Sequence, residues 1–152
     1  MEPTSVTPWS SDWAWGLPLI VVTVAIHSFG LTIINHRVSL GLNGNGKNRL
    51  PRMASAMIVP GMALYASILQ GFEGALWAAA YLVLGALPDR KSAMLYSLNA
   101  MTTYGHANID LQLHWQLMGS LEALNGWILF GLTTAFLFTV MQKVWPHFNQ
   151  ST

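Results

Sequence analysis

The sequence predicts an all-α membrane protein, with three membrane-crossing helices and a shorter helix and loop between the second and the third. Three observations lead to this fold class. The chain of 152 residues is 53% hydrophobic and only 9% charged, whereas soluble domains carry about 25% charged residues. Its apolar segments are long enough to cross a hydrocarbon core of about 30 Å. A polar stretch, "MTTYGHANI" at residues 101–109, lies between two of these segments.

Composition also excludes several classes of function. The chain has no cysteine, so disulfides, thiol chemistry and cysteine metal sites are absent. Its net charge of +1 comes without an extended basic cluster, so nucleic acid is not an expected partner. No nucleophile–base pair, phosphate-binding loop or clustered metal triad is visible. We therefore expect a protein that is not an enzyme and has no cofactor, and whose first partner is the lipid bilayer.

The first expected span covers residues 17–36, and it has Pro18 in its first turn, where the missing N–H costs nothing. The second apolar segment, 53–87, is longer than a bilayer requires, since as one helix it would reach about 50 Å. Either Pro60 and Gly61 kink it, leaving residues 51–60 at the interface, or the helix is straight and tilted. A turn at residues 71–74 is not expected, because the remainder would be too short to span.

The third expected span covers residues 115–142, which completes a single membrane domain over residues 1–152. Five of the seven basic residues lie after the first or the third span. With three spans these regions share a side, which the positive-inside rule makes cytoplasmic. The sequence therefore predicts a multi-pass protein of the cell (inner) membrane, with the N-terminus outside and the C-terminus in the cytoplasm. The five basic residues are Arg37, Lys47, Arg49, Arg52 and Lys143, and the tryptophans expected at the interfaces are Trp9, Trp13, Trp15 and Trp115 outside and Trp145 inside.

Residues 91–101 predict a short amphipathic helix that covers only about half a bilayer. Irregular backbone at membrane depth is tolerated only where protein surrounds it or where it lines a water-filled cavity. The partial negative charge at a helix C-terminus favours a cation, and the loop 102–109 offers carbonyls and the hydroxyls of Thr102 and Thr103. This layout is typical of a re-entrant pore helix followed by a pore loop.

The stretch "SLNAMTTYGHANI" resembles the pore-helix and filter signature of the potassium-channel superfamily, in which a Thr-Thr-x-Gly-Tyr-Gly-Asp pattern lies between an outer and an inner helix. Residues 122–138, "EALNGWILFGLTTAFLF", are similar to the inner helix of small bacterial ion-channel proteins. Together these matches cover about residues 75–140. The resemblance implies a homotetramer, because a ring-shaped filter takes its oxygens from about four copies of the loop.

By position, the resemblance assigns the paired threonines to Thr102 and Thr103 and the first filter glycine to Gly105. A monovalent cation, potassium or another, would then bind at Thr102 and Thr103. Alanine in the left-handed backbone region costs roughly 1–2 kcal/mol, so Ala107 is not expected to form the outermost site. We expect cation passage with altered or weak selectivity. The implied ion-coordinating residues are Thr102, Thr103, Tyr104, Gly105, His106, Ala107 and Asn108, among which Tyr104 replaces a small aliphatic residue, His106 a tyrosine, Ala107 a glycine and Asn108 an aspartate.

The resemblance also implies that Thr133 and Thr134 line an inner cavity. Gly126 and Gly131 are either hinge points or small residues for close helix packing. The leading hypothesis is a tetrameric cation channel with a non-standard filter. The alternative is a non-conducting membrane subunit or scaffold that kept the channel fold. The sequence contains no arginine ladder in its first span, so the stimulus that opens such a path is not predicted.

Ionisable residues inside a membrane segment are functional hypotheses by default. Glu122 is interpreted as filter support, hydrogen-bonded from behind to the pore helix or filter and protonated; a structural bond between helices and a direct ion contact are the alternatives. His27 and Glu73 are expected at similar depth and are candidates for a pair, although Gln70 or a water-filled crevice explains Glu73 equally well. His106 is either a group whose protonation by external acid lowers conductance or one hydrogen-bonded behind the filter. A metal site at His106, Asp110 and His114 is disfavoured, because the spacing is loose.

Overall fold

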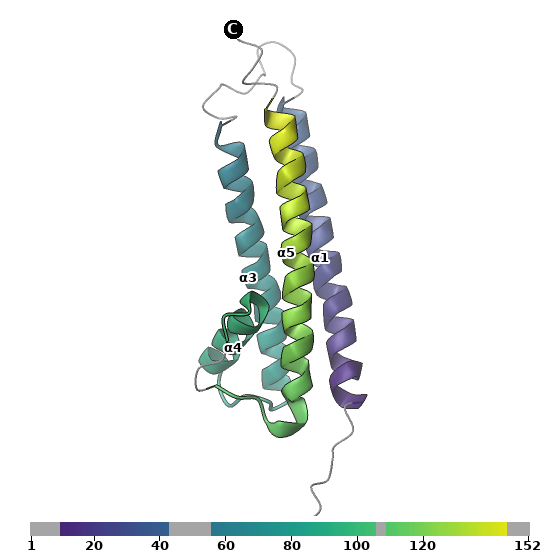
Figure 1. The fold of residues 1–152 in the computed structure, drawn as a ribbon, viewed down its shortest axis with the longest axis vertical. Coiled ribbons are helices and arrows are strands. Elements are labelled where there is room, and N and C mark those ends of the chain that lie inside the picture. Colours follow the sequence, from purple (N-terminus) through teal and green to yellow (C-terminus); the bar gives the residue numbers. More distant parts are fainter. Residues whose placement is uncertain (1–9, 43–55, 106–108, 146–152) are drawn as a thin grey trace, which may run out of the picture. The chain divides into compact units, whose positions relative to one another are not determined.

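The computed structural model describes residues 10–42, 56–105 and 109–145, and within these residues every regular element is a helix. Figure 1 shows three long helices, α1 (Ser10–Leu42), α3 (Ile58–Val83) and α5 (Gln116–Val144), and the shorter α4 (Arg90–Thr102). One 3-10 turn, η2 (Leu113–Trp115), precedes α5. At about 1.5 Å per residue, α4 is only about 20 Å long, whereas each long helix exceeds about 30 Å.

Two helical segments, Ser10–Gly41 and Leu113–Val144, are long and apolar enough to cross a membrane. They support the membrane class that the composition predicts. The third span, the re-entrant position of α4 and the orientation of the chain stay predictions. Trp13, Trp15 and Trp145 are exposed, as belt residues must be, but Trp115 is buried in the protein core and therefore does not belong to an exposed belt. Trp9, Lys47, Arg49 and Arg52 lie outside the described residues.

Helix α1 is longer than the expected span 17–36 at both ends. Its first turn contains Asp12, whose Oδ1 accepts a hydrogen bond from the backbone N–H of Met118 at 3.2 Å. This carboxylate thereby satisfies one of the free N–H groups at the start of α5, and the contact fixes residues before 17 in place. Consequently Pro18 lies inside α1 and not in its first turn, and Arg37 belongs to the helix and not to the following loop.

Helix α3 resolves the two alternatives for the region 53–87 in part, since residues 51–55 lie outside the described chain. The helix contains Pro60 and Gly61 in its first turns and continues without interruption through residues 71–74, so the expectation of no turn there is confirmed. It ends at Val83, before the expected boundary of 87. Gly85 adopts a left-handed φ of 65°, and the bonds from Gly85 N to Leu82 O and from Ala86 N to Tyr81 O form a Schellman motif.

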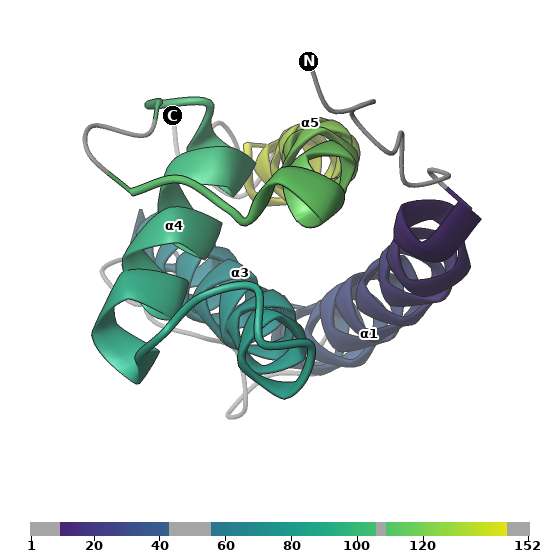
Figure 2. The ribbon, with the colours of Figure 1, turned by 90° about the horizontal axis from the view of Figure 1, so that it is seen from below.

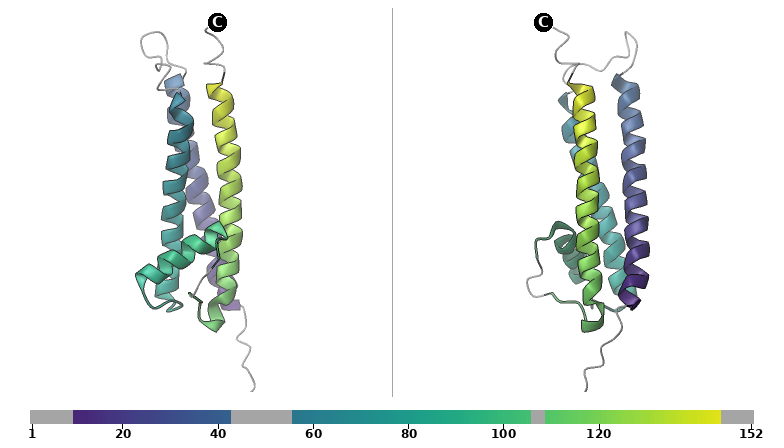
Figure 3. Two further views of the ribbon diagram at one scale, coloured as in Figure 1. Left: turned by 60° about the vertical axis from the view of Figure 1, so that its left-hand side comes forward. Right: turned by 45° about the vertical axis from the view of Figure 1, so that its right-hand side comes forward.

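Contacts divide the chain into two compact units, each built from sections of the three long helices. The first unit comprises Met1–Val24 and Gly71–Ile128, and it includes α4. Figures 2 and 3 show that α4 runs obliquely beside α3 and α5 and lies away from α1. The core of this unit contains Trp77, Ala78, Tyr81, Ala86, Leu87, Ala93, Tyr96, Ala100, Leu111, Trp115, Met118 and Leu121.

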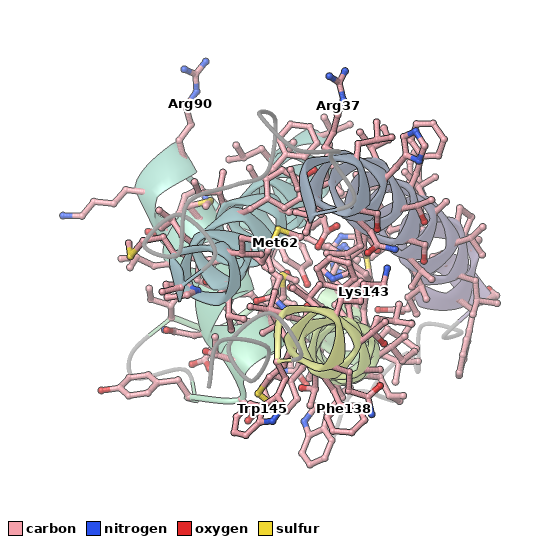
Figure 4. All side chains as sticks on the ribbon, turned by 90° about the horizontal axis from the view of Figure 1, so that it is seen from above. Arg37, Met62, Arg90, Phe138, Lys143 and Trp145 are labelled. Atoms are coloured by element: carbon pink, nitrogen blue, oxygen red, sulfur yellow. The ribbon has the colours of Figure 1, made fainter. Side chains whose placement is uncertain are left out.

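The second unit comprises Ala25–Gln70 and Leu129–Thr152. Met62, Val140 and Val144 form its buried apolar core. In Figure 4, Lys143 points towards α1, whereas Arg37 points away from the helices. The ammonium of Lys143 donates to Asn35 Oδ1 at 2.9 Å and to Ser39 Oγ at 3.2 Å. This lysine therefore joins the last turns of α1 and α5 through polar contacts.

Candidate functional site

The candidate site is built around α4, whose start is fixed by Asp89. The Asp89 side chain accepts the backbone N–H groups of Lys91 at 2.9 Å and Ser92 at 3.0 Å, and it also accepts the Ser92 hydroxyl at 2.7 Å. These bonds satisfy free donors of the first turn, which is the role of an N-cap aspartate. They allow α4 to begin at Arg90, directly after the short connection from α3.

The Asp89 cap should depend on pH. The hydrogen bond from the Ser92 side chain, followed by that from its backbone, holds the pKa of the Asp89 carboxyl below its ordinary value. A lowered folded-state pKa means that the cap contributes fully above the ordinary carboxyl range, near pH 4, and is lost as the pH falls through the lowered pKa. The protection of the Lys91 and Ser92 amides against hydrogen exchange, relative to the intrinsic rate at each pH, should therefore fall on acidification. Asp89→Ala should remove the pH response, and exposed Asp110→Ala should keep it; an unchanged profile in Asp89→Ala would contradict the assignment.

Helix α4 packs closely on α3 and α5 at glycines of those helices. A Cβ on Gly126 would overlap the carbonyl oxygen of Met101 and lie 2.7 Å from its Cα. A Cβ on Gly119, one heptad earlier on α5, would overlap the Tyr96 hydroxyl. Gly74 of α3 leaves room for the side chains of Ser97, Leu98 and Met101. Of the two α5 glycines expected to act as hinges or packing positions, Gly126 is therefore a packing position, while nothing lies within 4 Å of a Cβ at Gly131.

Glu122 is an acidic residue at the centre of this packing, and its side chain is fully buried. Its Oε2 accepts the Tyr81 hydroxyl of α3 at 2.6 Å, and its Oε1 is in short hydrogen-bond contact with the Ser97 hydroxyl of α4. The same Ser97 hydroxyl lies 2.7 Å from the carbonyl oxygen of Gly74. Tyr81 and Tyr96 pack edge to face, with ring centroids 5.4 Å apart. The carboxyl group of Glu122 thus joins α5 to both α3 and α4.

The C-terminus of α4 ends in a second Schellman motif, with Thr103 in the left-handed position at φ 55° and ψ 24°. Thr103 N donates to Ala100 O, and Tyr104 N donates to Asn99 O, both at 3.0 Å. A β-branched residue at positive φ is strained. The next glycine, Gly105, also has a positive φ, of 97°. Residues 102–105 are all exposed, so the polar segment after α4 is presented on the surface of the unit.

The structure places the predicted filter residues as follows. Thr102 is the last residue of α4 and not the first residue of a loop, because its hydroxyl donates to Leu98 O at 2.7 Å within the helix. The Thr103 hydroxyl donates to Thr102 O at 2.7 Å. Both threonine hydroxyls therefore make local bonds in one chain. Tyr104 is exposed over 84% of its surface. The remaining three predicted filter residues, His106, Ala107 and Asn108, lie outside the described residues, and so do the hypotheses on His106.

Thr133 and Thr134 do not face the same way. Thr133 is half-buried in the second unit, where its Oγ1 lies 2.9 Å from His27 Nε2 and accepts Gln70 Nε2 at 3.5 Å. Thr134 is exposed, and its hydroxyl donates to Phe130 O at 2.9 Å. Neighbouring positions on a helix point about 100° apart, so the two hydroxyls have different surroundings within the chain, and the lining of a cavity by both stays a prediction.

His27 and Glu73 are both fully buried, but they belong to different units of the structure. The described polar contact of His27 is Thr133 on α5. Their pairing stays a prediction. The described part of the chain contains no group of three His, Cys, Asp or Glu side chains that could hold a metal ion.

Sequence reasoning missed several residues of the site. Ser97 and Tyr81 were not singled out, because a serine or tyrosine on an apolar helix gives no signal until its buried partner is known. Asn125, also fully buried, accepts the Thr23 hydroxyl of α1 at 3.1 Å. Asp89 could have been found, since an aspartate immediately before a helical segment is an N-cap signal. Gly85 could have been found in the same way, as a glycine after a helix.

The strain at Thr103 predicts the effect of a single substitution. Thr103→Gly should raise the free energy of unfolding by about 1 kcal/mol, because a left-handed non-glycine residue costs roughly 1–2 kcal/mol and the lost exposed hydroxyl contact returns part of that gain. Titration of the purified protein from a mild to a denaturing detergent measures the change. Gly85→Thr, in the other Schellman motif, is the matched control and should lower stability instead. A destabilised Thr103→Gly would show that the hydroxyl matters more than the strain.

No family model matches this chain, and no curated protein or solved structure shows significant similarity to it.

Proposed function

We propose that the chain is a subunit of a tetrameric cation channel of potassium-channel-like architecture, in which the segment after α4 forms the ion path. The observation that carries the proposal is the placement of α4. Its C-terminal half packs against α3 and α5 at Ser97 and Met101, and its C-terminus presents four consecutive exposed residues, 102–105.

The length of α4 supports a re-entrant position. A helix of about 20 Å is too short to cross a hydrocarbon core of about 30 Å, yet α4 is joined directly to α3, and η2 leads directly into α5. The loops at the two ends are tied together, since Gln112 N donates to Ala86 O at 3.5 Å. The two loops thus meet at the end of α3 and the start of α5, an arrangement that supports a re-entrant position for α4.

The chemistry of the exposed segment supports a cation. The C-terminus of α4 carries partial negative charge from its last carbonyls, and residues 102–113 contain no lysine or arginine. Hard oxygen ligands are available from the carbonyls and hydroxyls of Thr102 and Thr103. Irregular polar backbone of this kind is tolerated in a bilayer only where it lines a water-filled path or is covered by protein. Four copies around one axis would provide both conditions.

Reconstitution of the purified chain into liposomes tests the proposal. We expect potassium flux above that of protein-free liposomes, with sodium passing to a measurable extent because the filter departs from the potassium-selective pattern. Thr103→Val should change the ratio of the two fluxes, since it removes an oxygen ligand. Val83→Ala, at an exposed position at the end of α3, should leave both fluxes unchanged. A folded tetramer without flux, or a protein that is monomeric in the bilayer, would contradict the proposal.

A non-conducting membrane subunit is the second candidate, and the conformation at Thr103 favours it. The hydroxyls of Thr102 and Thr103 bond to backbone within the chain, and the Schellman motif turns the backbone instead of extending it. A scaffold of this kind would form the same tetramer and would carry no current. The absence of flux from a correctly assembled tetramer would establish this candidate in place of the channel.

A further inference from the structure

The two hydrogen-bond contacts of the Ser97 hydroxyl require two hydrogens, but the hydroxyl carries only one. Its hydroxyl oxygen lies 2.7 Å from the carbonyl oxygen of Gly74 and in short contact with Oε1 of Glu122. A hydroxyl carries one hydrogen, and a backbone carbonyl can only accept. Two close oxygen–oxygen contacts therefore need two hydrogens between them, and Ser97 supplies one.

We propose that Glu122 carries the second proton on Oε1 and donates it to Ser97, so that the neutral carboxyl works as the positioning group of α4. Ser97 in turn donates to the carbonyl of Gly74 on α3, and the Tyr81 hydroxyl donates to Oε2 of Glu122. Every polar atom of the set then has a partner, and the donors form one continuous chain from α5 through α4 to α3. The inference rests on packing within one chain and holds whether or not the protein conducts ions.

The groups that face Glu122 agree with a neutral carboxyl. From α3 and α4 these are the phenols of Tyr81 and Tyr96, and from α1 the carboxyl of Asp12 faces the same core. The basic residues of this unit that the structure describes are all exposed: Arg90 and Lys91 at the start of α4, and His114 in η2. A fully buried carboxylate without a cationic partner carries a large desolvation cost, whereas the neutral acid keeps all its hydrogen bonds.

The position of α4 depends on the proton of Glu122. Without it, Gly74 O and Glu122 Oε1 compete for the single Ser97 hydrogen, so one of the two close oxygen–oxygen contacts has no hydrogen between its atoms. Loss of the proton would therefore weaken the attachment of α4 to α3 or to α5. The direction is fixed: the attachment is complete while Glu122 is protonated and is lost as the pH rises through its titration.

Infrared spectroscopy of the full chain in liposomes tests the assignment, because a protonated carboxyl has a carbonyl band that a carboxylate lacks. We expect such a band at neutral pH, shifted by exchange into deuterium oxide and lost in Glu122→Gln. Glu73→Gln, which alters the other fully buried glutamate, should keep the Glu122 band. Glu122→Gln should also keep its fold, because the amide can donate to Ser97 and accept from Tyr81.

A second variant keeps the assignment testable if Glu122→Gln does not fold. Ser97→Ala removes the acceptor of the Glu122 proton, so the carboxyl band should shift to higher wavenumber. The proposal is overturned if Glu122→Gln has the same protonated-carboxyl spectrum as the unchanged chain. It is equally overturned if Ser97→Ala leaves that spectrum unshifted.

Discussion

Gly126→Ala is expected to displace α4 and to lower the free energy of unfolding by about 3 kcal/mol, at the upper end of the typical cost of overpacking. The added methyl group would overlap the carbonyl oxygen of Met101 and lie 2.8 Å from its carbonyl carbon. These are backbone atoms of α4, so no side-chain rotation can relieve the clash. The stability should be measured by titration with a denaturing detergent, and cation flux should fall in parallel.

Gly131→Ala is the matched control for this prediction. It makes the same chemical change five residues later on α5, where nothing lies within 4 Å of the new Cβ. Alanine favours a helix over glycine by about 1 kcal/mol, so this variant should be neutral or slightly stabilised. If both variants were equally destabilised, or if Gly126 tolerated alanine as well as Gly131 does, α4 would not be packed against Gly126.

Glu122→Ala is expected to have the second large effect, a loss of about 2–4 kcal/mol. The substitution leaves a cavity among three helices and removes the acceptor of the buried Tyr81 hydroxyl. A double-mutant cycle with Tyr81→Phe identifies the source of the loss. Because the two side chains share a hydrogen bond, the cycle should give a coupling energy of about 1 kcal/mol or more. Additive effects of the two substitutions would show that the Tyr81–Glu122 bond contributes nothing.

The apolar helices could be predicted from the sequence, because their composition alone determines them. An apolar segment of about 20 residues has few alternatives to a membrane helix, and the short helix was predicted over residues 91–101 from its amphipathic pattern. The importance of Glu122 was also predictable, since an acid in such a segment needs a buried partner. Its hydrogen bond to Ser97 joins it to α4, the predicted pore helix. Its role as support of a filter stays a prediction.

The boundaries and partners were less predictable, because contacts between distant residues decide them. Helix α1 begins at Ser10, well before the expected start at 17, and Asp12 in its first turn binds the N–H of Met118, which is far away in the sequence. A threonine on an apolar helix has no directional signal, so the contact of Thr133 with His27 on another helix could not be predicted. Thr102 and Thr103 were expected in a filter-like loop after the short helix, whereas the Schellman motif places them at the helix end.

A thiol-block measurement at position 104 tests the proposed ion path most directly. The chain has no cysteine of its own, so Tyr104→Cys introduces a single reactive group on an exposed residue just after α4. We predict that a charged thiol reagent abolishes cation flux through liposomes containing this variant. The same reagent should leave flux unchanged in Leu64→Cys, an exposed position on α3. Complete modification of the thiol introduced by Tyr104→Cys, with undiminished flux, would place the ion path elsewhere and contradict the proposed function.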